Sequence, residues 1–246
     1  MLNKLKILMV CVMIADAIIF GSALAVMRGN GLEENAMKEE ECSMKAPETT
    51  TTLEDTKTTG NTDTAIALTF DDGPHAECTP LLLDGLNARG VHATFFLMGQ
   101  NIPGNEVLVQ RMQQEGHLIG NHSYRHIQLT KASESAVCQA VEETGELIAS
   151  ITGSRPQYLR PPYGAWNESL ECHTNLTTVF WTVDSLDWKL QDTAAIVRRV
   201  EQTIKPGDII LLHDIFPTSV AAALRLIDDL QTQGYTFVTV DELLVE

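Results

Sequence analysis

The sequence is poor in positive charge for its length. Its 246 residues contain 17 Lys and Arg against 33 Asp and Glu, which gives a formal net charge of −16. Binding to nucleic acid depends on basic side chains that neutralise phosphates, so this balance argues against nucleic acid as a partner. The hydrophobic fraction of 44% is normal for a globular protein. The length permits one large domain or two small ones.

The sequence also lacks a cysteine framework and internal repeats. Its five cysteines are scattered and include no C-x-x-C pair, which excludes a disulfide-rich scaffold. If the chain is exported, one disulfide among Cys78, Cys138 and Cys172 is open to it, and the sequence does not decide the pairing.

The N-terminus has the pattern of an export or anchoring segment. Lys4 and Lys6 precede an apolar run from Ile7 to Met27. Roughly 20 apolar residues can span a bilayer, and Ala23-Leu24-Ala25 also fits a signal-peptidase site. We therefore expect residues 1–27 to be either a signal peptide or a membrane anchor, with the rest of the chain outside the cytoplasm.

The next segment differs in composition from everything after it. Residues 28–62 are rich in Glu and Thr and contain few large apolar side chains, which predicts a disordered linker. From Asp63 onward, short β-rich runs alternate with amphipathic helical patterns. Residues 63–246 are thus predicted to form the folded domain.

Strand–helix alternation over this domain predicts a parallel sheet with helices outside it. Seven strands are expected at 65–70, 91–97, 118–120, 158–160, 177–183, 208–212 and 235–240. Helices are expected at 80–87, 106–115, 133–151, 193–204 and 219–231. The fold class is therefore α/β, and the strand number favours an incomplete or distorted (β/α) barrel.

Two of the predicted strands end in residues that can bind a metal. The first ends in Asp71-Asp72, and adjacent carboxylates after an apolar strand are unfavourable unless they are paired or metal-bound. The third ends in His122 and His126, which would share one face of a helical turn. Alone, this histidine spacing also fits two surface side chains. With an Asp from the first strand it gives three ligands and open positions, the pattern of a catalytic metal site.

Three further strand ends carry polar residues suited to chemistry. Arg160-Pro161-Pro162-Tyr163-Gly164 places an Arg, which can bind a carboxylate bidentately, before a stiff loop. Asp187-Trp188 follows the fifth strand, and His213 follows an apolar run with carboxylates nearby, as a general acid could. Because the carboxyl ends of parallel strands meet at one edge, these groups are expected to form one site.

These five motifs, taken in order, resemble those of the polysaccharide deacetylases, the carbohydrate esterases of family four that contain the NodB-homology domain. The matching segments are Thr69-Phe70-Asp71-Asp72-Gly73, His122-Ser123-x-x-His126, Arg160-Pro161-Pro162-Tyr163-Gly164, Asp187-Trp188 and Leu211-x-His213-Asp214. The resemblance extends over roughly residues 63–246, and it implies the distorted (β/α) barrel of that family.

The resemblance also implies a role for each motif residue. Asp71 would be the general base, oriented by Arg160, and His213 the general acid, tuned by Asp187. Three residues would bind the metal: Asp72, His122 and His126. The backbone N–H of Tyr163 would stabilise the oxyanion, while Trp188 and Leu211 would line the pocket for the acetyl methyl group. Zn²⁺ is the expected metal, with Co²⁺ or another divalent transition metal as alternatives.

The leading hypothesis is a metal-dependent hydrolase that removes N-acetyl groups from GlcNAc or MurNAc units of a polysaccharide. The export signal favours peptidoglycan, and chitin oligomers stay open. An O-acetyl esterase acting on acetylated xylan is the main alternative, followed by an inactive sugar-binding protein and a helical metal phosphohydrolase. The chain is expected to be a monomer that contacts a membrane only through its N-terminal segment.

Overall fold

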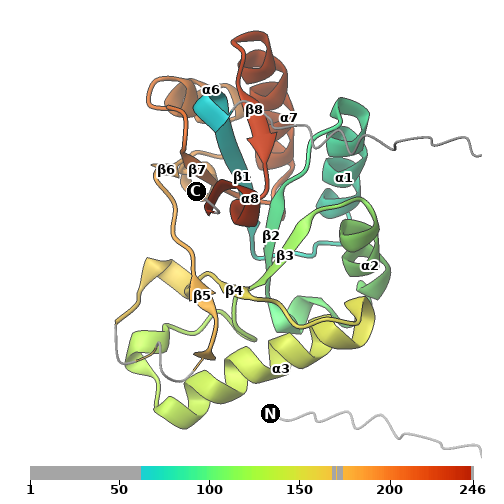
Figure 1. The fold of residues 1–246 in the computed structure, drawn as a ribbon, viewed down its shortest axis with the longest axis vertical. Helices are drawn as coiled ribbons and strands as arrows, with labels where there is room; N and C mark the ends of the chain where they lie inside the picture. Colours follow the sequence, from blue (N-terminus) through green and yellow to red (C-terminus); the bar gives the residue numbers. More distant parts are fainter. Residues whose placement is uncertain (1–61, 168–169, 171–173, 245–246) are drawn as a thin grey trace, which may run out of the picture. The chain divides into compact units, whose positions relative to one another are not determined.

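The computed structural model describes residues 62–167, 170 and 174–244, in which parallel strands alternate with helices (Figure 1). The strands are β1 (Ala65–Asp71), β2 (Thr94–Leu97), β3 (Leu118–Asn121), β4 (Tyr158–Leu159), β5 (Thr177–Thr178), β6 (Val183–Asp184), β7 (Ile209–His213) and β8 (Thr236–Val238). The longer helices are α1 (Cys78–Arg89), α2 (Glu106–Gln114), α3 (Glu134–Thr152), α6 (Thr193–Glu201) and α7 (Pro217–Thr232). Two short helices are α5 (Asp187–Leu190) and α8 (Val240–Leu244).

Several predictions concern residues outside this range. The expected signal or anchor segment, residues 1–27, and nearly all of the expected linker lie outside the described residues. None of the helices between residues 62 and 244 that the structure describes is long and apolar enough to cross a bilayer. Cys78 is a free, buried thiol, and Cys172 lies outside the described residues, so a disulfide formed by Cys172 stays a prediction.

The sheet confirms the predicted parallel α/β architecture. Its strands follow the order β5-β4-β3-β2-β1-β7-β6, and β8 pairs with the start of β1; every pairing is parallel. In Figure 1, α1 and α2 lie beside the strands on one side, and α3 runs beneath β4 and β5. The two ends of this order, β5 and β6, do not pair with each other in the described sheet. The curled sheet is therefore an incomplete barrel, as the strand number suggested.

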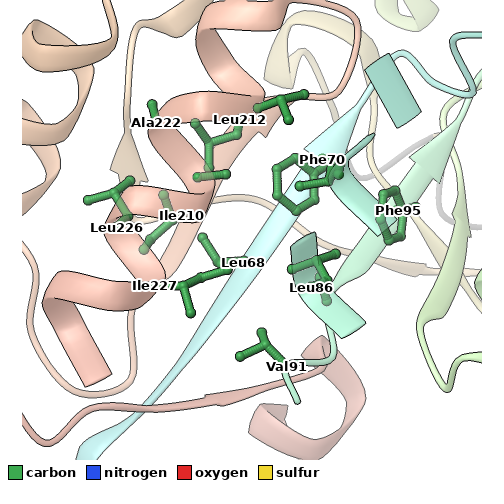
Figure 2. Close-up of a cluster of buried hydrophobic side chains, with 14 of the residues drawn as sticks. Leu68, Phe70, Leu86, Val91, Phe95, Ile210, Leu212, Ala222, Leu226 and Ile227 are labelled. Carbon is green, nitrogen blue, oxygen red and sulfur yellow. The ribbon is translucent and has the colours of Figure 1, made fainter. Parts of the chain in front are cut away.

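Strand β1 is central in the sheet, and its two faces point to different surroundings. All seven of its residues are buried, as expected for a parallel strand covered on both sides. Because side chains alternate along a strand, Ile66, Leu68 and Phe70 point into the main hydrophobic core. Figure 2 shows Leu68 and Phe70 among side chains from β7 and α7. The alternate residues Ala67, Thr69 and Asp71 therefore face the inside of the barrel.

The longest helix begins and ends where its sequence predicts. The hydroxyl of Ser133 accepts a hydrogen bond from the backbone N–H of Ala136 and so caps the start of α3. At the other end, Gly153 has a φ of 79°, a left-handed conformation that glycine adopts without steric cost. The helix predicted at residues 133–151 is thus confirmed with small changes at its ends.

One predicted strand is wrong. Residues 177–183 form two short strands, and they lie at opposite ends of the sheet: β5 pairs with β4, whereas β6 pairs with β7. Between them, the carbonyls of Val179 and Phe180 accept hydrogen bonds from the side chain of Arg160 instead of from a neighbouring strand. The apolar run gave no sign of this interruption, because the side chain that donates to these carbonyls comes from another part of the chain.

His117 is a buried histidine remote from the five motifs. Its side chain is 1% exposed, and its ring packs edge-on against Phe95 with 5.3 Å between ring centroids. Its Nδ1 accepts the backbone N–H of Ala93 at 3.1 Å, so the ring is held in its neutral form. Burial, with smaller contributions from His92 and Arg111, lowers the pKa of His117 to about 4.

His117 should make stability depend on pH in the acidic range. An unfolded chain binds the proton near pH 6.5, whereas the folded chain binds it near 4, so stability is complete above pH 6.5 and declines as the pH falls toward 4. The full effect is about 3 kcal/mol of unfolding free energy. In His117→Asn, urea unfolding between pH 7 and pH 4.5 should show a weaker decline than in the wild type. Equal declines would contradict this assignment.

Candidate active site

Residues from five strand ends meet in one cleft of about 480 Å³. The cleft lies at the carboxyl ends of the strands, where sites form in parallel α/β folds. The lining residues are Asp71, Asp72, His122, His126, Tyr163, Trp181, Asp184, Trp188, Leu211 and His213. Of the ten site residues expected from the sequence, eight line the cleft. The other two, Arg160 and Asp187, are fully buried and each contacts a residue that lines it.

Asp72, His122 and His126 form a group that fits a metal ion. Their possible ligand atoms all lie within 4.8 Å of one another. The Nε2 atoms of His122 and His126 are 3.5 and 3.6 Å from Oδ1 of Asp72. That oxygen is buried and has no hydrogen-bond partner among the described residues. A buried carboxylate oxygen without a partner, facing two imidazole nitrogens, is well suited to a divalent cation.

Neighbouring groups prepare the two imidazoles for this role. Nδ1 of His122 lies 2.7 Å from the carbonyl oxygen of Arg160, so it carries the ring hydrogen and donates it to that oxygen. In the neutral ring the lone pair of Nε2 is then available to a metal, an arrangement common among metal-binding histidines. Burial and the nearby His122 lower the pKa of His126, although the charges of Asp72 and Asp71 oppose this.

The expectation that the two histidines share a helical turn is wrong. Residues 122–126 form a loop after β3, in which Ser123 and His126 adopt positive φ angles of 63° and 54°. Asp72 and Tyr163 also have positive φ angles, 72° and 62°. Such backbone conformations are unfavourable for residues other than glycine, and they concentrate at functional sites. Strained turns, not helix geometry, bring these side chains together.

Asp71 is paired with the buried Arg160. Nη1 of Arg160 donates to Oδ1 of Asp71 at 2.9 Å, and the side chain of Arg160 has no exposed surface. The other carboxylate oxygen, Oδ2, lies 3.7 Å from Nε2 of His122, next to the candidate metal site. Arg160 therefore fixes one oxygen of Asp71 and leaves the second directed toward the cleft.

His213 is held by Asp187 in a similar way. Nδ1 of His213 donates to Oδ1 of Asp187 at 2.8 Å, and the backbone N–H of His213 donates to Oδ2 at 2.8 Å. Burial lowers the pKa of His213, but the hydrogen bond and charge of Asp187, with the charges of Asp71 and Asp72, outweigh it and raise the pKa to about 9. Nε2 of His213 lies 4.0 Å from Oδ2 of Asp72, so it is directed toward the candidate metal site.

The remaining expected residues form the walls of the cleft. Tyr163 and Trp188 are 67% and 52% exposed, whereas Leu211 is 5% exposed, so the aromatic side chains form the rim and the leucine lies deeper. Two lining residues, Trp181 and Asp184, had no expected role. Trp181 lies in the misassigned strand, and a Cβ at Gly164 would lie 2.9 Å from its ring. This close approach explains a glycine after Tyr163, but sequence spacing alone does not reveal it.

Gly73 and Asp214, which both belong to the motifs, lie in close contact. Asp214 is fully buried, and burial raises its pKa to about 7 although a hydrogen bond from Thr79 opposes this. A Cβ added to Gly73 would approach both carboxylate oxygens of Asp214 to a distance that no real side chain tolerates. The turn after Asp72 therefore requires glycine, because the residue after His213 occupies the space.

Comparison with known proteins agrees with this geometry. The family model described as polysaccharide deacetylase matches residues 58–178. The peptidoglycan-N-acetylglucosamine deacetylase of Bacillus cereus is 40% identical over 185 residues, which cover 72% of this chain and 67% of that protein. The chain belongs to the polysaccharide deacetylase family. In this family it is also similar to the peptidoglycan-N-acetylglucosamine deacetylase PgdA of Listeria monocytogenes, with 41% identity over 75% of this chain.

The match to the Listeria family member is partial. The chain spans about two fifths of that protein's length, 40%. Among solved structures of the family, the peptidoglycan deacetylase PdaC from Bacillus subtilis superposes with a TM-score of 0.72 at 40% identity. That alignment covers 74% of this chain and 90% of the solved chain. The fold expected from the five motifs is thereby confirmed.

The contact between Gly73 and Asp214 can be tested by a double-mutant cycle. Gly73→Ala should lower the unfolding free energy by about 1–3 kcal/mol, because the new methyl group overlaps the carboxylate. In an Asp214→Ala background the same change should be less destabilising, since the overlapping atoms are gone. Urea unfolding of the four proteins measures both effects.

Gly145→Ala is the matched control for this cycle, because its Cβ would lie no closer than 3.7 Å to another residue. It should not destabilise the helix α3 in either background. If the effect of Gly73→Ala were the same with and without the Asp214 carboxylate, the contact would not be the reason for glycine.

Proposed function

We propose that this chain is a metal-dependent hydrolase that removes N-acetyl groups from GlcNAc or MurNAc units, with peptidoglycan as its substrate. Family membership supports the reaction class. Two similar proteins, from Bacillus cereus and Listeria monocytogenes, are named peptidoglycan-N-acetylglucosamine deacetylases, which supports the substrate. The expected export segment at residues 1–27 agrees with action outside the cytoplasm, on the cell wall.

One structural observation carries this proposal. A single cleft contains a three-residue metal group, a carboxylate fixed by a buried arginine, and a histidine fixed by a buried aspartate. Hydrolysis of an amide by water needs a base for the water, stabilisation of an oxyanion and an acid for the leaving nitrogen. The cleft has a candidate for each requirement.

Asp72, His122 and His126 would hold the metal, and Zn²⁺ fits this mixture of one carboxylate and two imidazoles. A bound divalent ion supplies Lewis acidity, which lowers the pKa of water and polarises a carbonyl oxygen. Co²⁺ and other divalent transition metals accept the same ligands. The orphaned Oδ1 of Asp72 and the free Nε2 of His122 are the observations that support the assignment.

Asp71 is the general base in this proposal. As water adds to the acetyl carbonyl carbon, Oδ2 of Asp71 accepts one of its protons. Arg160 keeps Oδ1 occupied, so only one oxygen is available and its direction is fixed. The oxygen of the tetrahedral intermediate would receive a hydrogen bond from the backbone N–H of Tyr163. One such donor is typically worth about 3 kcal/mol of transition-state stabilisation.

His213 is the general acid. Asp187 accepts the hydrogen on Nδ1 and also binds the backbone of His213, so Nε2 faces the cleft and the charged imidazolium is favoured. When the carbon–nitrogen bond breaks, Nε2 donates its proton to the departing nitrogen. The products are acetate and an amino sugar unit. Trp188 and Leu211 would enclose the acetyl methyl group.

Release of acetate is the direct test of this function. The 246-residue chain, loaded with Zn²⁺, should release acetate from peptidoglycan and from GlcNAc oligomers, and a chelator should abolish the release. Acetylated xylan serves as the comparison substrate. Release from xylan alone would indicate an O-acetyl esterase, and release from none of the three would contradict the proposed function and favour a sugar-binding role.

His213→Ala should separate catalysis from metal binding. Loss of a general acid typically lowers kcat by a factor of roughly 10² to 10⁴. Because His213 is not in the metal group, zinc stoichiometry measured by atomic emission should equal that of the wild type. If the variant lost its zinc, His213 would be a ligand and its role as acid would be wrong.

His126→Ala, unlike His213→Ala, should weaken metal binding. It removes one of three ligands, so the zinc affinity measured by competition with a chromophoric chelator should fall by more than roughly 100-fold. His92→Ala is the matched control, since His92 is an exposed histidine outside the cleft, and its zinc affinity should equal that of the wild type. Equal affinities in both variants would exclude His126 from the site.

A further inference from the structure

Thr69 lies inside the barrel, next to the Arg160–Asp71 pair, and has no role in the mechanism above. It is fully buried, and it shares the inner face of β1 with Asp71 because the two residues are separated by one position. Its hydroxyl donates to the carbonyl oxygen of Ile210 in β7 at 2.7 Å. The hydroxyl oxygen of Thr69, Oγ1, in turn accepts a hydrogen bond from Nη1 of Arg160 at 2.6 Å.

The direction of these two bonds is fixed by chemistry. A guanidinium group has donors and no acceptor, so the hydroxyl oxygen must be the acceptor in its contact with Arg160. A hydroxyl has one hydrogen, and the carbonyl of Ile210 takes it. Thr69 thus connects β7 to the guanidinium group through a single oriented oxygen.

Nη1 of Arg160 has two hydrogens, and both are used near the base. One is donated to Thr69 and the other to Oδ1 of Asp71 at 2.9 Å. The rest of the guanidinium group donates to the carbonyls of Val179 and Phe180 at 3.4 and 3.1 Å. Its face lies 4.2 Å from the centroid of the Phe96 ring. The contact with Thr69 is the shortest of these hydrogen bonds.

We propose that the hydroxyl of Thr69 is a positioning group for the general base, acting through Arg160. With the hydroxyl in place, both hydrogens of Nη1 are bound, so the guanidinium plane has one orientation and holds Oδ1 of Asp71 in one position. Without it, one hydrogen of a fully buried cation has no acceptor, and Arg160 turns to find another. Asp71 moves with it. This inference rests on the proposed function, in which Asp71 accepts the proton from water.

The neighbouring strand contains a matched control. Thr94 of β2 is in register with Thr69 and is equally buried. Its hydroxyl also takes part in a buried hydrogen bond, which it accepts from the backbone N–H of Val240 at 3.0 Å. Thr94→Val therefore removes the same group at the same level of the sheet, but this hydroxyl is not among the hydrogen-bond partners of Arg160 in the described residues.

Three variants of the 246-residue chain test the proposal: Thr69→Val, Thr69→Ser and Thr94→Val. Displacement of a catalytic group by about 1 Å can lower a rate by roughly 100-fold, so kcat of Thr69→Val should fall by about 10- to 100-fold while KM changes less than about threefold. Thr69→Ser keeps the hydroxyl and should retain most of the wild-type kcat. Thr94→Val should lose a similar amount of thermal stability and keep its kcat.

Crystal structures of Thr69→Val and Thr94→Val give a readout that does not depend on activity. The contact between Arg160 and Asp71 should be displaced in the first variant and unchanged in the second. An unchanged contact in Thr69→Val, or a kcat equal to that of Thr94→Val, would overturn the proposal. A wild-type chain that releases no acetate would instead refute the proposed function, and the two structures would still decide whether Thr69 positions Arg160.

Discussion

The buried ion pair between Arg160 and Asp71 is the interaction on which most of this structure depends. A guanidinium group without exposed surface must find partners inside the protein, and it finds them on β1, on the segment after β5 and in the ring of Phe96. Removing one partner of such a pair costs about 3–5 kcal/mol, because the other charge is left buried and unpaired. The same pair thus holds the strands together and orients the carboxylate that the proposed reaction uses.

Four of the aspartates in and around the cleft differ in their neighbours, and this difference separates their roles. Asp71 is bound by an arginine, Asp187 by a histidine, and Asp214 by the hydroxyl of Thr79. Asp72 alone has a buried oxygen facing two imidazole nitrogens. Asp72 has a positive φ of 72°, unlike a strand residue, and the two consecutive carboxylates take different partners within one cleft. Sequence adjacency therefore does not mean shared chemistry.

Much of the fold could be predicted from hydrophobic periodicity. Helices α2, α3, α6 and α7 match their amphipathic patterns, α1 lies where a helix was expected, and the parallel sheet follows from strand–helix alternation. The split of residues 177–183 could not be predicted from the local pattern, because the carbonyls between the two strands are bound by Arg160, 19 and 20 residues earlier in the sequence. Local patterns show which residues are apolar, but they do not show which side chain elsewhere in the chain will donate hydrogen bonds to a strand's carbonyls.

The candidate site, like the fold, could be predicted from the sequence only in part. Eight of the expected residues meet in the cleft because strand ends converge, which is a property of the fold class. The conformations that aim them, such as the left-handed Ser123 and Tyr163, depend on packing that spacing does not encode. Trp181 and Thr69 were missed for a related reason. Each lies within an apolar strand pattern, where a residue that contacts the site resembles one that only packs.

Isotope labelling tests the central claim, that water is added to an acetyl carbonyl in this cleft, most directly. N-acetylated peptidoglycan would be treated with the zinc-loaded chain in water enriched in oxygen-18, and acetate and glycan would be analysed by mass spectrometry. We expect each acetate to contain one oxygen-18 atom and each altered sugar to have gained a free amine without label. Label in the sugar, or glycan that keeps all its acetyl groups, would contradict the account.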